Sequence, residues 1–281
     1  DLIEAEIEVI GAMGVEIRCG VEVGKDVTID QLRAQGYKGF YLAIGCQGGR
    51  KPGVPGEDAV GVYTAVEFLK EAGQKESFDL GGDVVVVGGG NVAIDAARVS
   101  TRCGTGKVSM FCLESRDEMP ASREEILEAT EEKVAIHNGW GPQEILTENG
   151  RTVGVVFKKC IRVFDDNHRF APVYDEQETM TVACSAVIFS VGQGIVWGDL
   201  LQGTKVALRP NGGAVADSLT YQTAEPDIFV GGDVYTGPKF AIDAIAAGRE
   251  GAVSLHRFVH EHCTLTIGRN RRDFIELDKE N

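Results

Sequence analysis

The sequence has few of the features that mark metal-binding, membrane or nucleic-acid-binding proteins. Its seven cysteines form no C-x-x-C and no C-x-x-x-x-C pair, so their spacing supports neither a zinc or iron–sulfur site nor a redox-active disulfide. No run of about 18 apolar residues occurs, and we therefore expect no membrane-spanning helix. Positive charge is scarce: 28 basic residues against 43 acidic ones leave a net charge of −15, which disfavours nucleic acid as a partner.

The remaining composition is that of an ordinary globular protein. Apolar residues make up 43% and charged residues 25% of 281 positions, which is enough for two medium domains or one large one. Scattered cysteines are typical of small buried side chains in a reducing compartment, so we expect a cytoplasmic protein. The first residue is Asp1 rather than Met, within a helix-type pattern. The chain is therefore expected to be part of a longer protein.

Residues 83–98 carry the strongest functional signal. Four consecutive valines predict a strand that is covered on both faces, and three glycines and a helical pattern follow them. The spacing Gly-x-Gly-x-x-Ala, from Gly88 to Ala93, matches the dinucleotide-binding fingerprint. In that motif the pyrophosphate lies on amide donors at the helix N-terminus, where the helix dipole favours negative charge. The residues expected to contact it are Gly88, Gly89, Gly90, Asn91 and Val92.

The flanking sequence supports this interpretation. Residues 107–113 predict a second strand, and Glu114 directly follows it. The fingerprint expects an acidic residue about 20 positions further on, which accepts hydrogen bonds from the adenosine ribose hydroxyls. A glycine turn in another α/β fold without a nucleotide is the alternative.

The rest of the chain contains two further apolar strands that end in glycine, at residues 39–45 and 186–193, and a third at 227–233 that ends in a carboxylate. This repetition predicts two related nucleotide-binding units, one nested inside the other. Residues 15–19 are expected to form a short strand, 123–133 a charged helix and 143–182 a β-meander. Thr64, with Glu67 three positions later, and Ser122 are the predicted N-caps of two helices.

Asp233 precedes a helix that is expected to start near Phe240. A strand-end aspartate followed by a helix N-terminus is typical of a site for a polyol or phosphate ligand, and the alternative is an ordinary turn aspartate. Taken together, six segments carry a family signature: residues 42–45, 87–95, 119–123, 191–193, 231–233 and 244–249.

With these segments the chain resembles the flavin-dependent small (β) subunit of glutamate synthase, the flavoprotein part of dihydropyrimidine dehydrogenase, and ferredoxin-linked NAD(P)H oxidoreductases. The resemblance implies an α/β fold in which a Rossmann-like three-layer nucleotide-binding domain of the FAD/NAD(P) type is inserted in an incomplete second one. It implies an NAD(P)-binding domain at residues 57–210. Residues 1–56 and 211–262 would be the C-terminal part of an FAD-binding domain, and 263–281 a C-terminal extension.

The resemblance also implies cofactor contacts outside the glycine turn. The Asp233 carboxylate would bind the FAD ribitol, and the helix N-terminus at Ala241 and Ile242 would face the isoalloxazine ring. The glycines expected at the cofactor sites are Gly45, Gly192 and Gly232. These residues lack the glycine fingerprint with which the family binds FAD, and they lack its cysteine-rich segment. FAD is therefore expected in the full-length protein rather than in this part of it.

Cofactor choice depends on the end of the second strand. Relatives that use NADPH carry a pair of arginines there, which hold the 2′-phosphate, whereas this chain has Leu113 and Glu114. A carboxylate repels that phosphate, and NAD is therefore expected over NADP. Arg116, two positions later, keeps NADP(H) as the less favoured possibility.

The leading hypothesis is an oxidoreductase subunit that transfers hydride from the nicotinamide dinucleotide to FAD and passes electrons to an Fe–S protein or a larger redox subunit. The cofactors supply the chemistry, so no side chain is assigned as a catalytic residue and none as a metal ligand. The alternative is a non-catalytic nucleotide-binding or subunit-docking module. A disulfide reductase is opposed by the missing cysteine pair.

Overall fold

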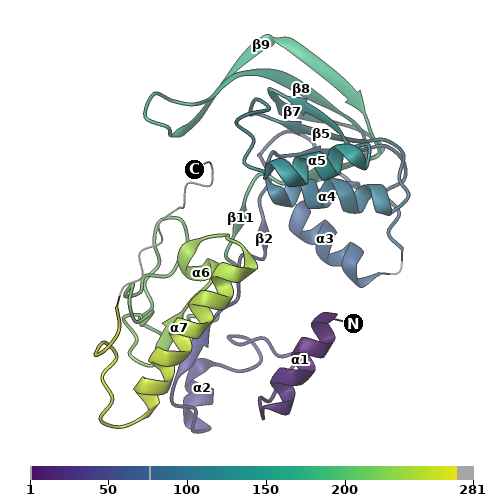
Figure 1. The fold of residues 1–281 in the computed structure, drawn as a ribbon. Helices are drawn as coiled ribbons and strands as arrows, with labels where there is room; N and C mark the ends of the chain where they lie inside the picture. Colours follow the sequence, from purple (N-terminus) through teal and green to yellow (C-terminus); the bar gives the residue numbers. More distant parts are fainter. Residues whose placement is uncertain (1, 76, 271–281) are drawn as a thin grey trace. The chain divides into compact units, whose positions relative to one another are not determined.

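The computed structural model describes residues 2–75 and 77–270, and the chain divides into two compact units (Figure 1). Unit 2 is continuous, from Gln47 to Gly194, and it is inserted between the two segments of unit 1, which end at Cys46 and resume at Ile195. Strand β2 (Gly48–Gly49) pairs antiparallel with β11 (Gln193–Gly194). Because this pair holds both ends of the insertion together, the unit boundaries lie there rather than at the expected 56/57 and 210/211.

Unit 2 is built on a five-stranded parallel sheet with the order β3-β10-β4-β5-β6. Helices and an antiparallel meander complete it. The sheet strands are β3 (Val62–Thr64), β4 (Val84–Val87), β5 (Val108–Cys112), β6 (Ala135–Asn138) and β10 (Ala186–Phe189), and the helices are α3 (Ala65–Gln74), α4 (Asn91–Arg102) and α5 (Arg123–Glu131). The meander consists of β7 (Trp140–Glu148), β8 (Arg151–Phe164) and β9 (Phe170–Ala183).

The two faces of the sheet are covered by different elements. Side chains alternate along a strand, so Val84 and Val86 pack with Ile94 of α4, whereas Val85 and Val87 pack with Phe157 of the meander. Figure 1 shows the helices on one side of the sheet and β7, β8 and β9 on the other. The sheet therefore lies between two apolar layers. This arrangement confirms the predicted α/β three-layer fold.

Unit 1 contains a two-stranded parallel sheet, in which β1 (Phe40–Leu42) pairs with β12 (Ile228–Val230). Its helices are α1 (Leu2–Ala12), α2 (Ile29–Ala34), α6 (Asp233–Thr236) and α7 (Ala241–Val259). Residues 15–19 are exposed and form no strand, so that prediction was wrong: among the described residues no neighbouring strand pairs with them. The apolar side chains of Ile242 and Ile245 are 69% and 66% exposed.

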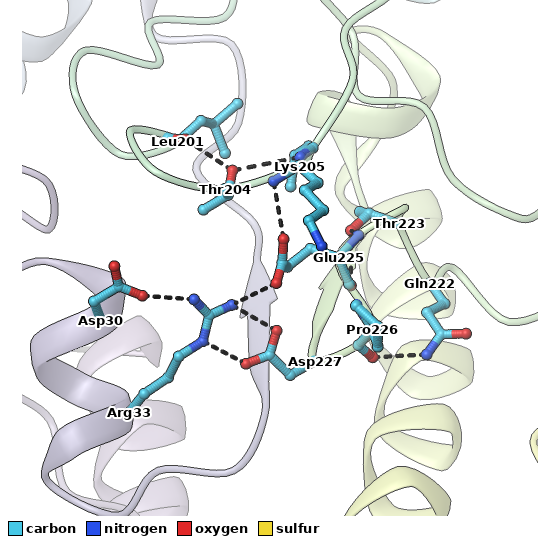
Figure 2. A network of polar contacts seen from close by, with 11 residues as sticks. Asp30, Arg33, Leu201, Thr204, Lys205, Gln222, Thr223, Glu225, Pro226 and Asp227 are labelled. Carbon is cyan, nitrogen blue, oxygen red and sulfur yellow. Dashed lines mark hydrogen bonds and ion pairs between the residues drawn. The ribbon is translucent and has the colours of Figure 1, made fainter.

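A polar cluster connects α2 to the start of β12 (Figure 2). Arg33 donates hydrogen bonds to both oxygens of Asp227 at 2.7 Å and to Glu225 at 3.2 Å, and a fourth bond reaches Asp30 at 2.7 Å. The hydrogen bond to Asp227 is the main reason why the pKa of Arg33 is raised. The second oxygen of Glu225 accepts a hydrogen bond from the Lys205 amide, at 2.9 Å. The cluster thus ties three segments of unit 1 together.

No helix in the described part of the chain is long and apolar enough to cross a membrane.

Candidate nucleotide-binding site

The turn after β4 requires glycine for steric reasons. Gly88 has a φ of +148°, and a Cβ built on it would lie 2.4 Å from the carbonyl oxygen of Ser190. A Cβ on Gly89 would lie 2.8 Å from Oε2 of Glu114. At Gly90, by contrast, a Cβ would meet nothing within 4 Å. The turn therefore packs tightly against β10 and β5, and it is open to solvent at Gly90.

Helix α4 begins at this turn without a side-chain cap. Its N-cap is Gly90, whose carbonyl accepts hydrogen bonds from Ala93 at 2.9 Å and Ile94 at 3.2 Å. The amides of Asn91 and Val92 precede these donors, and first-turn amides have no acceptor within their own helix. An anion at this end of α4 would be favoured by both the free donors and the helix dipole.

A second loop, residues 119–122, supports the turn. The Ala121 amide donates to the Gly89 carbonyl at 3.0 Å, and the Ser122 amide donates to Oδ1 of Asn91 at 2.9 Å. Ser122 also caps α5, as the sequence predicted, by accepting a hydrogen bond from the Glu125 amide. The side chain of Asn91 thus holds this loop in place. The backbone N–H of Asn91 is the group that remains available to a ligand.

Glu114 lies beside the glycine turn, as the distance between its carboxylate and Gly89 shows. Burial is the largest cause of a raised pKa for this carboxyl group, and the charge of Glu118 adds to it. Asn138, at the end of β6, donates to the Glu114 carbonyl at 3.1 Å and to Sγ of Cys112 at 3.2 Å. Sequence reasoning missed Asn138, although a polar residue at the carboxyl end of a strand is a recognisable signal.

A cavity of about 500 Å³ adjoins this strand end. Arg116, which is exposed and forms no ion pair with another described residue, lines it together with basic residues of β8 that the sequence did not single out. Lys159 is one of these, and its ammonium group lies 4.7 Å from the centre of the Trp140 ring. Glu118 and Asp165 line it as well, so the cavity combines basic and acidic side chains with apolar walls, and it reaches Ser115, the residue after Glu114.

The other predicted site residues fall in both units. Gly192 follows β10 in unit 2 with a φ of +115°, whereas Gly45, with a φ of +66°, belongs to unit 1. Also in unit 1, Gly232 has a φ of +65° and precedes Asp233, whose Oδ1 accepts a hydrogen bond from the Lys239 amide at 3.3 Å. Helix α7 starts at Ala241 and Ile242 without a side-chain cap, so its first amides are open.

The described residues contain no group of three or more histidine, cysteine or acidic side chains that could hold a metal ion. All seven cysteines are free thiols. Burial is the largest cause that raises the pKa of Cys112 and of Cys184 to about 12. The thiolate is the reactive form of cysteine, so both of these side chains are unreactive near neutral pH.

The parallel sheet, the glycine turn and the strand-end acid together define an α/β protein of the FAD/NAD(P)-binding class. Within that class, the family described as pyridine nucleotide-disulphide oxidoreductase matches residues 3–248. The chain belongs to this family.

Curated relatives agree with the resemblance noted in the sequence. The chain is 34% identical to the β subunit of the NADP(+)-dependent formate dehydrogenase of Moorella thermoacetica, over 94% of this chain and 38% of the relative. It is also 34% identical to the small chain of glutamate synthase [NADPH] of Escherichia coli, over 87% of this chain and 55% of the relative. The chain thus spans roughly two-fifths to just over half of the length of these relatives.

Among solved structures, FprA of Mycobacterium tuberculosis in complex with NADPH superimposes with a TM-score of 0.67. The match covers 85% of this chain and 67% of FprA at 18% identity, and it therefore shows a shared fold.

Proposed function

We propose that this chain is the nucleotide-binding part of a flavin-dependent NAD(P)H oxidoreductase subunit. In this proposal unit 2 binds the nicotinamide dinucleotide, and unit 1 provides the C-terminal part of an FAD site. FAD, when bound, supplies the acceptor of the hydride, and electrons then pass to an Fe–S protein or a larger redox subunit. The observation that carries the proposal is the turn at Gly88 to Gly90, which is packed against two strands and open where a phosphate would approach.

The residues of unit 2 would bind and orient the dinucleotide. The amides of Asn91 and Val92 would donate hydrogen bonds to the pyrophosphate, at the positive end of α4. The Glu114 carboxylate would accept hydrogen bonds from the adenosine ribose. No side chain is needed as an acid or base, because hydride transfer between the two cofactors involves no proton held by the protein.

In unit 1, Asp233 and the open N-terminus of α7 at Ala241 and Ile242 are the proposed flavin contacts. The turn at Gly232, with its φ of +65°, brings the backbone into α6 directly after β12. Gly45 and Gly192 are proposed at the edges of the two sites. Names of relatives such as the small chain of glutamate synthase indicate subunits of larger assemblies, which supports a partner subunit for this chain as well.

We further propose that NADH is preferred over NADPH. Relatives differ in the nucleotide that their names give: NADP(+) for the formate dehydrogenase subunit, NADPH for the glutamate synthase chain and NAD for a dihydropyrimidine dehydrogenase subunit of E. coli. The preference proposed for this chain depends on Glu114, whose ionised carboxylate would repel a 2′-phosphate. Arg116, on the adjoining cavity, would hold that phosphate when NADPH binds.

The substitution Gly90→Ala tests the proposed nucleotide site. Gly90 has a φ of −93°, which alanine adopts readily, and the added Cβ meets no protein atom, so the free energy of unfolding should change by less than about 1 kcal/mol. The Cβ would, however, keep the pyrophosphate from the backbone. We expect the Kd for NADH, measured by calorimetry, to rise by about tenfold or more.

The matched control is Gly73→Ala on α3, where a Cβ also meets nothing within 4 Å. This variant should bind NADH as the wild type does. The proposed site is wrong if the wild-type chain binds neither NADH nor NADPH, or if Gly90→Ala leaves NADH binding unchanged.

Flavin retention tests the proposal that unit 1 provides only part of the FAD site. We expect these 281 residues to purify without stoichiometric flavin, whereas a protein of the relatives' length would be yellow and reducible by NADH. Contacts to the FAD pyrophosphate, each a charge-assisted hydrogen bond of about 1.5–3 kcal/mol, would come from outside this chain. Flavin absorbance after dialysis measures this, and a bound equivalent of FAD would contradict the proposed division of the site.

A further inference from the structure

Arg50 lies along the glycine-containing segment that follows β10. Its amide donates to the Gly192 carbonyl at 3.2 Å, directly after the β2 and β11 pair. A Cβ on Gly192 would lie 3.6 Å from Cδ of Arg50, and a Cβ on Gly194 would lie 3.8 Å from its Nε. An added Cβ at either glycine would thus make only ordinary van der Waals contact with the arginine, so the Arg50 side chain passes close to both glycines.

Within the described residues the guanidinium group of Arg50 forms no ion pair and no hydrogen bond, and the residue is exposed. The next residue is different: Lys51 donates to the Glu57 carbonyl at 2.9 Å and forms an ion pair with Asp58 at 3.1 Å. In a protein with a net charge of −15, acidic partners are plentiful. The guanidinium group of Arg50 is nevertheless available to an external anion.

The sheet order places Arg50 on one defined side of the glycine turn. Strand β10 lies between β3 and β4, whereas β5, which leads to Glu114, lies on the opposite side of β4. The carbonyl of Ser190, after β10, closely approaches Gly88. A dinucleotide with its adenosine ribose at Glu114 and its pyrophosphate at α4 must therefore extend its nicotinamide half across the end of β10, toward Gly192 and Arg50.

We infer that Arg50 binds the nicotinamide-side phosphate of the dinucleotide, an inference that rests on the proposed function of unit 2. A guanidinium group matches phosphate geometry with two parallel N–H donors, and it carries the positive charge that the backbone amides of α4 lack. The phosphate on the adenosine side would remain with the amides of Asn91 and Val92. In this arrangement Arg50 holds the half of the cofactor that carries the reacting ring.

The experiment uses three probes and two variants of the 281-residue chain. NADH and ADP-ribose both contain the second phosphate, whereas AMP ends at the adenosine-side phosphate. For Arg50→Gln we expect the Kd for NADH and for ADP-ribose to rise by about tenfold at low salt, with the Kd for AMP unchanged. Arg50→Lys should recover part of the loss, because it keeps the charge without the paired donors.

Lys51→Gln is the matched control, since it removes the same charge from the neighbouring residue and should leave all three affinities as in the wild type. Equal NADH binding by Arg50→Gln and wild type would overturn the assignment. An equal loss of AMP binding would also overturn it, since this would indicate a structural effect. A wild-type chain that binds none of the three probes would instead refute the proposed function itself, so the two failures are distinguishable.

Discussion

The guanidinium group of Arg33 forms a bidentate ion pair with Asp227: Nε lies 2.7 Å from one carboxylate oxygen and Nη2 lies 2.7 Å from the other (Figure 2). The two residues are 194 positions apart in the sequence. Their side chains are 27% and 19% exposed, so water screens the pair only in part. The ion pair joins helix α2 to the strand that leads to Asp233.

Arg33→Met should lower the free energy of unfolding by about 1.5–3 kcal/mol, because it leaves two partly buried carboxylates without their common donor. Chemical denaturation followed by circular dichroism measures the change. Arg18→Met is the control: Arg18 pairs with Glu16, and these side chains are 58% and 68% exposed. An exposed pair contributes little, so a loss of similar size in both variants would contradict this account.

Tyr41 and Gly251 provide a test of packing in unit 1. The Tyr41 hydroxyl donates to the Ala247 carbonyl at 3.0 Å, and burial raises the pKa of Tyr41 to about 12. A Cβ on Gly251 would lie 2.1 Å from the tyrosine ring. Gly251→Ala should therefore destabilise the protein by about 1–3 kcal/mol through overpacking.

Gly248→Ala on the same helix is the control, since a Cβ there meets nothing within 4 Å. This variant should gain about 0.5–1 kcal/mol from helix propensity. Thermal unfolding of both variants gives the comparison. If Gly251→Ala is as stable as Gly248→Ala, the tyrosine does not occupy the position described.

Glu114→Arg should shift the preference between NADPH and NADH toward NADPH by about 1–3 kcal/mol. The substitution removes a repulsive charge and adds a donor for the 2′-phosphate. The ratio of the two Kd values measures the shift. Glu144→Arg, at an exposed position of β7, changes the net charge equally and should leave the ratio unchanged. A wild-type chain that binds both nucleotides equally well would contradict the role proposed for Glu114.

Glu114 should also make the stability of the ligand-free protein depend on pH. Burial raises the pKa of its carboxyl group in the folded state, so the folded protein retains this proton to a higher pH than the unfolded chain. The resulting stabilisation is present below the ordinary carboxyl pKa, and it is lost as the pH rises through the raised value. Glutamine does not ionise, so Glu114→Gln should not lose stability as the pH rises in this way. The variant should therefore be more stable than the wild type at neutral pH.

Denaturation curves of the wild type and Glu114→Gln between about pH 4 and pH 8 test this dependence. The difference between the two proteins should widen as the pH increases. Glu144→Gln, which removes an exposed carboxylate, should follow the wild type throughout. A constant difference across the range would show that Glu114 does not titrate as described.

Several features could be predicted from the sequence because they depend on neighbours in the chain. The four valines and three glycines before α4 determined a buried strand and a tight turn, since steric demands act over a few residues. The capping box of Thr64 and Glu67 formed as predicted. The acid at Glu114 could be placed near the turn because the carboxyl ends of adjacent parallel strands meet at one edge of the sheet.

Other features were decided only by the tertiary structure. The β2 and β11 pair set the unit boundaries, and the ion pair of Arg33 with Asp227 spans most of the chain. Residues 15–19 have the apolar pattern of a strand, yet they form none, because a strand requires a partner that local sequence does not specify. Whether Arg50 is paired depends on which carboxylates the fold brings near it. Contacts between distant residues follow from how whole elements pack, and residue spacing along the chain does not encode them.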